Sequence, residues 1–80
     1  MLDLKSRETI RMMADYDMNV TEIARNCRFH RNTIEYRLAQ IQIKTGLNPK
    51  RFYDLMKLVE MAEADEQEER WLRILREKEV

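Results

Sequence analysis

The side chains of this chain that are best suited to binding another molecule gather between residues 28 and 40. In the segment FHRNTIEYRLAQI, residues 29–41, long hydrogen-bonding side chains surround three aliphatic ones, and Glu35 is the only acid. Side chains of these types donate hydrogen bonds to phosphate oxygens and to the edges of bases. The polar residues that we select as candidate contacts, one of them from the preceding helix, are Thr21, Arg28, His30, Arg31, Asn32, Thr33, Tyr36, Arg37 and Gln40.

Catalysis and metal binding have no comparable set of residues. Cys27 is the only cysteine and His30 the only histidine, which excludes an intramolecular disulfide and a zinc cluster. We expect Cys27 to be a small core residue. His30 has no nucleophile or carboxylate placed to work with it, so it is expected to cap the following helix or to contact phosphate. The sequence therefore predicts a protein that is not an enzyme and has no catalytic residue, no metal, no cofactor and no small-molecule ligand.

The charges are unevenly distributed, although they cancel over the 80 residues. Residues 25–51 carry seven basic side chains against Glu35 alone, whereas acids dominate from residue 52 onward. Local charge density sets electrostatic affinity, so the basic middle segment indicates a polyanionic partner. The acidic run at 60–69 is most simply a solvated helix face, which would also repel DNA. No signal peptide or apolar run of membrane-spanning length is visible, so we expect a cytoplasmic protein with no membrane partner.

Composition and spacing predict an all-α fold in one small domain. A first helix is expected at about residues 4–15, and a short second helix after a cap at Asn19. A third helix should run from about residue 31 to 45 and end at Gly46. Asn48 and Pro49 should open a fourth helix as its cap and first residue. Beyond it, either this helix continues or a fifth begins at Asp65. The predicted fold is a helix-turn-helix three-helix core with one or two additional C-terminal helices, divided into a domain at 1–64 and an amphipathic segment at 65–80.

The helix at 31–45 should bury one face and expose the other. Ile34, Leu38 and Ile41 recur at helical spacing and form the inward stripe. At about 100° per residue the outward positions are Asn32, Glu35, Tyr36, Ala39 and Gln40. Arg37 lies between the two faces, and it has two interpretations: an ion pair with an acid of the first or fourth helix, or a phosphate contact. Tyr36 is opposite the stripe, which favours exposure and DNA contact over a core position.

Two short helices joined by a tight turn, with the second helix longer and basic, form the helix-turn-helix pattern. Its buried positions are occupied by Ile23, Cys27, Phe29 and Ile34, and Ala24 is the small residue where the two helices cross. Arg28 occupies the turn position that most often holds glycine. In such motifs the first turns of the second helix enter the DNA major groove, where Arg pairs with guanine and Asn with adenine. Thr33 and the helix N-terminus suit a phosphate.

At these residues the chain resembles the C-terminal helix-turn-helix domain of PucR/CdaR-type transcriptional regulators. The resemblance covers about Thr9 to Ala62, and it is carried by HRNTIEYRL from His30 to Leu38, with Ile41, Thr45-Gly46, Leu55 and Leu58. It implies a helical domain that binds double-stranded DNA sequence-specifically and takes part in transcription control. The alternative function is a protein-interaction module that has lost DNA binding and uses the acidic C-terminal third.

A second apolar cluster lies near the C-terminus, at Trp71, Leu72, Ile74 and Leu75. These side chains require a surface to cover them. They either pack back on the first or fourth helix of the same chain or form the seam of a homodimer. Helix-turn-helix proteins commonly bind paired half-sites as dimers, and a short chain gains core by pairing, so we favour the homodimer.

Overall fold

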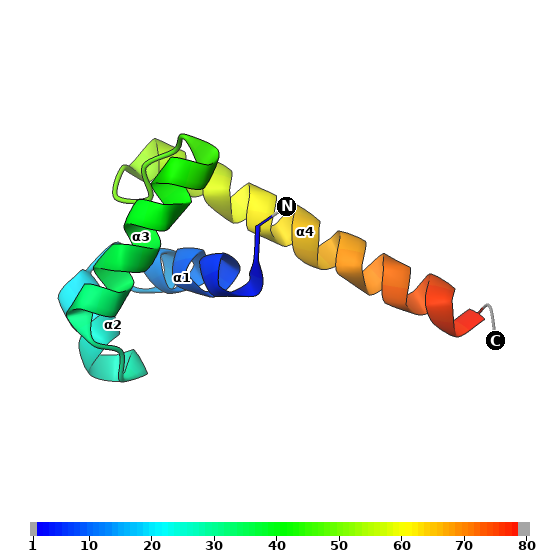
Figure 1. Ribbon diagram of the computed structural model, residues 1–80, viewed down its shortest axis with the longest axis horizontal. Coiled ribbons are helices and arrows are strands. Elements are labelled where there is room, and N and C mark those ends of the chain that lie inside the picture. The colour runs from blue at the N-terminus through cyan, green and yellow to red at the C-terminus, as the bar shows by residue number, and fades with distance from the viewer. Residues whose placement is uncertain (1, 79–80) are drawn as a thin grey trace.

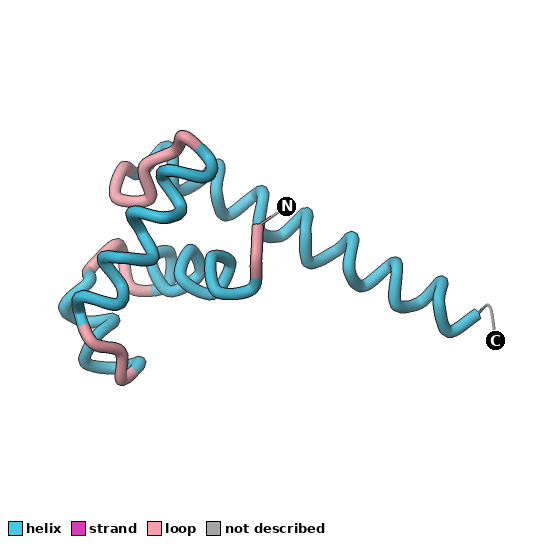
Figure 2. The backbone as a smooth tube through the Cα atoms, in the orientation of Figure 1, coloured by secondary structure: helices cyan, strands magenta, loops and turns pink. Residues whose placement is uncertain are grey.

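The computed structural model describes residues 2–78, which form four helices, α1 (Leu4–Asp15), α2 (Val20–Cys27), α3 (Arg31–Thr45) and α4 (Phe52–Lys78), and no strand. In Figures 1 and 2, α1, α2 and α3 gather at one end, and the last turns of α4 extend away from them. The all-α prediction is confirmed, and the first and third helices have the expected bounds. Among the described helices, none combines the length and the apolar character needed to cross a membrane.

Side chains that accept hydrogen bonds from the first backbone amides mark the beginnings of the first three helices. Asp3 Oδ1 accepts from the Ser6 amide at 2.8 Å, which caps α1. Asn19 Oδ1 accepts from the Glu22 amide at 3.1 Å, as the sequence predicts for α2. These bonds satisfy amides that have no partner inside the helix. At the other end of α3, Gly46 has a φ of 75° and ends the helix as predicted.

The end of α1 has a similar turn without glycine. The Met18 amide donates to the Met13 carbonyl at 2.7 Å, and the Asp17 amide to the Ala14 carbonyl at 3.4 Å. This pair of bonds is the Schellman motif, in which the residue after the cap is left-handed and usually glycine. Asp17 takes that conformation here, with a φ of 52°, and Met18 follows at 65°. Met18 also packs against the core, which supplies the apolar contact that accompanies this motif.

The core forms around α1, which contacts each of the other three helices. The apolar stripe predicted on α3 is buried, with Leu38 only 2% exposed and Ile34 and Ile41 fully covered. Burying such a side chain contributes roughly 1.5–3 kcal/mol. Cys27 is partly buried and packs against this core, as expected of a small filler. The buried apolar residues are Leu2, Ile10, Met13, Val20, Ile23, Ile34, Leu38, Ile41, Leu55, Leu58 and Ala62.

The fourth helix begins later than the sequence suggests, so the prediction of Asn48 as its cap and Pro49 as its first residue is wrong. Asn48 Oδ1 accepts from the Lys50 amide at 3.0 Å, and the Asn48 carbonyl accepts from the Arg51 amide at 3.0 Å. These bonds close a turn over residues 48–51, and α4 starts only at Phe52. An asparagine that bonds to the backbone two residues on forms a turn as readily as a helix cap, which explains the error.

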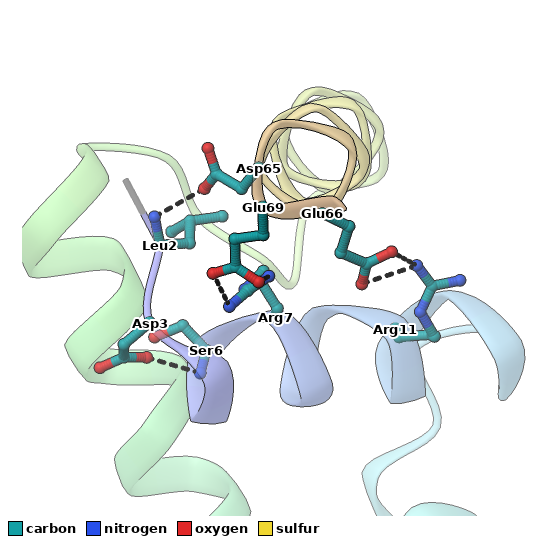
Figure 3. A network of polar contacts seen from close by, with 8 residues as sticks. All are labelled: Leu2, Asp3, Ser6, Arg7, Arg11, Asp65, Glu66 and Glu69. Carbon is teal, nitrogen blue, oxygen red and sulfur yellow. Dashed lines mark hydrogen bonds and ion pairs between the residues drawn. The ribbon is translucent and has the colours of Figure 1, made fainter. Parts of the chain in front are cut away.

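The choice between a fifth helix and one long helix is settled by α4, which runs without a break from Phe52 to Lys78. Its acids hold it against α1, as Figure 3 shows. Glu69 makes a bidentate ion pair with Arg7, at 2.8 and 3.0 Å, and Glu66 pairs with Arg11 at 3.0 Å. Asp65 accepts from the Leu2 amide at 2.7 Å. Part of the acidic run is therefore a helix–helix contact as well as a solvated face.

Candidate nucleic-acid interface

The turn between α2 and α3 consists of residues 28–30. Arg28 ends α2 in the left-handed conformation, with φ 59° and ψ 34°. Glycine is common at this position of the motif because it adopts such angles without a Cβ penalty. The fully covered side chains of Ile23 on α2 and Ile34 on α3 hold the two helices together across this turn. The backbone of the motif is thus fixed from inside, and its outer side chains remain available.

Most of the candidate contacts are exposed at the beginning of α2, in the turn and on the first two turns of α3. Tyr36 is 66% exposed, which supports the prediction that it faces outward. Gln40, one turn further along α3, is partly buried. The exposed members of the set are Thr21, Arg28, His30, Arg31, Asn32, Thr33 and Tyr36.

His30 is the cap of α3. Its Nδ1 accepts a hydrogen bond from the Asn32 amide at 3.1 Å, while the Thr33 amide donates to the His30 carbonyl at 3.0 Å. The capping role expected for His30 is therefore observed, and because Nδ1 accepts this bond, Nε2 is the ring nitrogen left to contact another molecule. Two of the first amides of α3 are already bonded, so an anion at this helix end would compete with the cap.

Arg37 belongs to the packing between α1 and α3. Its Nη1 lies 3.7 Å from Glu8 Oε1, and its guanidinium carbon lies 4.8 Å from the centre of the Phe29 ring. The side chain is 19% exposed. Of the two interpretations of Arg37, the structure thus contains the ion pair with an acid of the first helix, supplemented by a cation–π contact. These contacts engage the Arg37 guanidinium within the fold, away from the exposed set of side chains.

The one acid of α3 is paired. Glu35 forms an ion pair with Lys50, which lies in the turn before α4. An unpaired carboxylate at this position would repel phosphate, and the Lys50 charge offsets that repulsion. Lys50 is thus a functional candidate that reasoning from the motif does not identify, because the pair joins residues from two separate elements.

The basic residues of this region differ in whether an acid neutralises them. Arg25 pairs with Glu22 at 3.3 Å and Lys44 with Asp3 at 3.2 Å. Arg28 and Arg31, by contrast, form no ion pair with any described residue of the chain. Two exposed and unneutralised guanidinium groups therefore flank the N-terminus of α3. Guanidinium groups suit both phosphate oxygens and the guanine edge, because their donors form a rigid fork.

A comparison with known protein families matches most of the chain. The family model described as the PucR C-terminal helix-turn-helix domain matches residues 6–62, which is well over half of the chain. The matched range begins inside α1 and ends on α4 at its last core residue, Ala62. Comparison with curated proteins and with solved structures gave no match.

Proposed function

The chain belongs to the family of PucR C-terminal helix-turn-helix domains, and we propose that it binds double-stranded DNA sequence-specifically and acts as a transcriptional regulator. The binding element is α3, with its first two turns in the major groove. The observation that carries this proposal is the pair of unneutralised arginines, Arg28 and Arg31, at the exposed start of α3.

The side chains of this surface divide between base contacts and backbone contacts. Arg31 and Asn32, in the first turn of α3, are assigned to base edges, where they suit guanine and adenine respectively. Thr21 and Arg28, before and within the turn, are assigned to phosphates, which position the domain without reading sequence. Tyr36 lies about one turn further along and is assigned to the sugar–phosphate backbone.

The rest of the fold supports these roles by fixing α3 and by placing negative charge elsewhere. Three covered aliphatic side chains anchor α3, so its exposed groups are held on a rigid element. Glu66 and Glu69 are neutralised by α1, and Glu35 is neutralised by Lys50. Three acids are thus neutralised within the fold, whereas Arg28 and Arg31 keep their charge.

The test is a titration of the protein onto a pool of random DNA duplexes, followed by fluorescence anisotropy at several salt concentrations. We expect affinity that falls steeply with salt, with roughly 3–6 ions released on binding. Arg31→Glu should abolish binding. The matched control is Arg76→Glu, which makes the same charge change at an exposed residue near the end of α4.

Absence of binding at low salt would overturn the proposal. An equal loss in Arg31→Glu and Arg76→Glu would show that only net charge matters and would refute a role for α3. The rival function, a protein-interaction module without DNA binding, predicts that Arg31→Glu leaves partner binding intact. A pool that does bind can be sequenced after selection to identify the preferred site.

The location and the assembly state complete the proposal. The protein is expected to act in the cytoplasm and to bind its site as a homodimer. Trp71, Leu72, Ile74 and Leu75 are all exposed, and Trp71 is 65% exposed. They do not pack back into the core of the same chain, which favours a partner surface.

A further inference from the structure

A line of exposed residues along one face of α4 takes no part in the core. Its residues recur at alternating steps of four and three, which places them in a line along the helix. All are exposed, and the polar ones make no ion pair or side-chain hydrogen bond within residues 2–78. This line, which we call the α4 seam, consists of Met56, Glu60, Glu63, Gln67, Arg70 and Ile74.

The α4 seam has a hollow at each end. The first, of about 370 Å³, lies between the end of α1 and the start of α4 and is lined mainly by apolar side chains, including Met13, Met18, Phe52 and Met56. The second, of about 330 Å³, is lined by Gln67, Arg70, Trp71 and Ile74. The seam therefore has apolar ends and a polar middle.

We infer that a second copy of this chain covers the α4 seam with its own α4 in antiparallel orientation. Met56 of one protomer then lies opposite Ile74 of the other, Glu60 opposite Arg70, and Glu63 opposite Gln67. This inference deepens the homodimer of the proposed function and rests on it. Met56 and Ile74 are 18 residues apart, about 27 Å along the helix, so both ends are covered at once.

The charges select the antiparallel orientation. In a parallel symmetric pair each residue faces its own copy, which places Glu60 against Glu60, Glu63 against Glu63 and Arg70 against Arg70. Like charges in these positions are unfavourable. The antiparallel pair instead brings each Glu60 to an Arg70 and each Ile74 to the apolar hollow beside Met56. The contact is the same in both directions, as a two-fold dimer requires.

The apolar residues of the tail differ in how close they lie to this seam. Ile74 is in the seam, and Trp71 is on its flank, where it faces Lys57 of the second copy and suits a cation–π contact. Leu72 lies on almost the opposite side of α4, at about 160° from the seam. Trp71 is the only tryptophan, so its fluorescence reports whether the seam is covered.

The first test compares Ile74→Glu with Leu72→Glu, which place the same new charge on two sides of the tail. Sedimentation equilibrium should give a dimer for the unchanged chain. Ile74→Glu should weaken association by about tenfold or more, and Leu72→Glu by less than about threefold. Trp71 fluorescence of the unchanged chain should shift to the blue as concentration rises. A chain that stays monomeric up to about 100 μM, or equal losses in the two variants, would overturn the inference.

The second test reverses the charges. Glu60→Arg alone and Arg70→Glu alone each place like charges opposite one another, and each should weaken the dimer by about tenfold. The double variant restores the pairing and should recover most of the association. Recovery is not expected from any arrangement in which these two residues do not meet, and a double variant weaker than both singles contradicts the antiparallel seam.

These outcomes are separate from those of the proposed function. The seam variants change no residue of α2, α3 or the turn, so each should still bind a single DNA half-site with the salt dependence of the unchanged chain. Arg31→Glu should lose DNA and keep the dimer. A dimer that fails to bind DNA refutes DNA binding and leaves the seam standing. A DNA-binding monomer refutes the homodimer and its seam and leaves DNA binding by α3 standing.

Discussion

Replacing Gly46 by alanine isolates the backbone contribution to stability at the end of α3. The φ of this residue is 75°, and a Cβ added there would meet no atom within 4 Å. The substitution therefore creates no clash, and its effect comes from backbone conformation alone. Holding an L-residue in the left-handed region costs about 1–2 kcal/mol. Alanine also lowers the conformational entropy of the unfolded chain, which offsets about 0.4–1 kcal/mol of this cost.

The net expected loss for Gly46→Ala is about 1 kcal/mol, or a melting temperature lower by about 4–8 °C for a domain of this size. The measurement is thermal and urea unfolding followed by far-UV circular dichroism. The dimer must be absent, so the comparison is made in an Ile74→Glu background at low concentration.

The matched inverse is Asp17→Gly, because Asp17 occupies the left-handed position of the Schellman turn after α1. By the same reasoning it should gain stability, by roughly 0.5–1 kcal/mol. A Gly46→Ala variant as stable as the unchanged chain would refute the assignment of strain to this turn. Two changes of the same sign would refute the backbone argument as a whole.

Two further predictions concern ion pairs and acid. Glu69→Ala should lower the urea midpoint more than Glu66→Ala, because it leaves Arg7, whose side chain is only 8% exposed, buried without its partner. Arg7→Met, which removes the buried charge itself, should be close to neutral. Similar losses for all three variants would contradict this reasoning. Hydrogen bonds from Ser6 lower the pKa of Asp3 from 3.8 to about 2. A folded-state pKa below the unfolded value stabilises the protein above about pH 5 and loses that contribution as the pH falls toward 2. Asp3→Asn should keep the cap and flatten this part of the stability–pH curve, modestly because the side chain is more than half exposed.

The parts of the fold that follow from local rules are the parts that the sequence predicts. The bounds of α3 depend on a cap at His30, a stripe at Ile34, Leu38 and Ile41, and a left-handed Gly46, all between residues 30 and 46. The apolar periodicity and the residues that begin and end the helix can be recognised in the sequence alone. The exposure of Asn32 and Tyr36 also follows from the stripe by rotation about the helix, whereas Gln40, which the same rotation predicts to face outward, is partly buried.

The contacts that the sequence does not reveal join residues far apart in the chain. Arg7 and Glu69 are separated by 62 positions, and Glu35 and Lys50 belong to different elements. Nothing in local periodicity selects one acid among many as the partner of a given arginine. The late start of α4 is a different kind of error, because Asn48 suits both a helix cap and a turn, and its bond to the Lys50 amide decides between them.

The unbroken course of α4 has a consequence for how two protomers of the proposed dimer would share a DNA site. A helix of 27 residues is about 40 Å long and does not bend freely, so the tail and the helix-turn-helix core move as one body. In the proposed dimer, binding of one α3 to its half-site would therefore hold the second α3 at high effective concentration near a single position on the duplex. Two binding surfaces of modest individual affinity then act as one tight site, provided that the half-sites have the spacing set by the dimer. DNA whose half-sites are moved by half a helical turn should lose this avidity and retain only the affinity of one protomer.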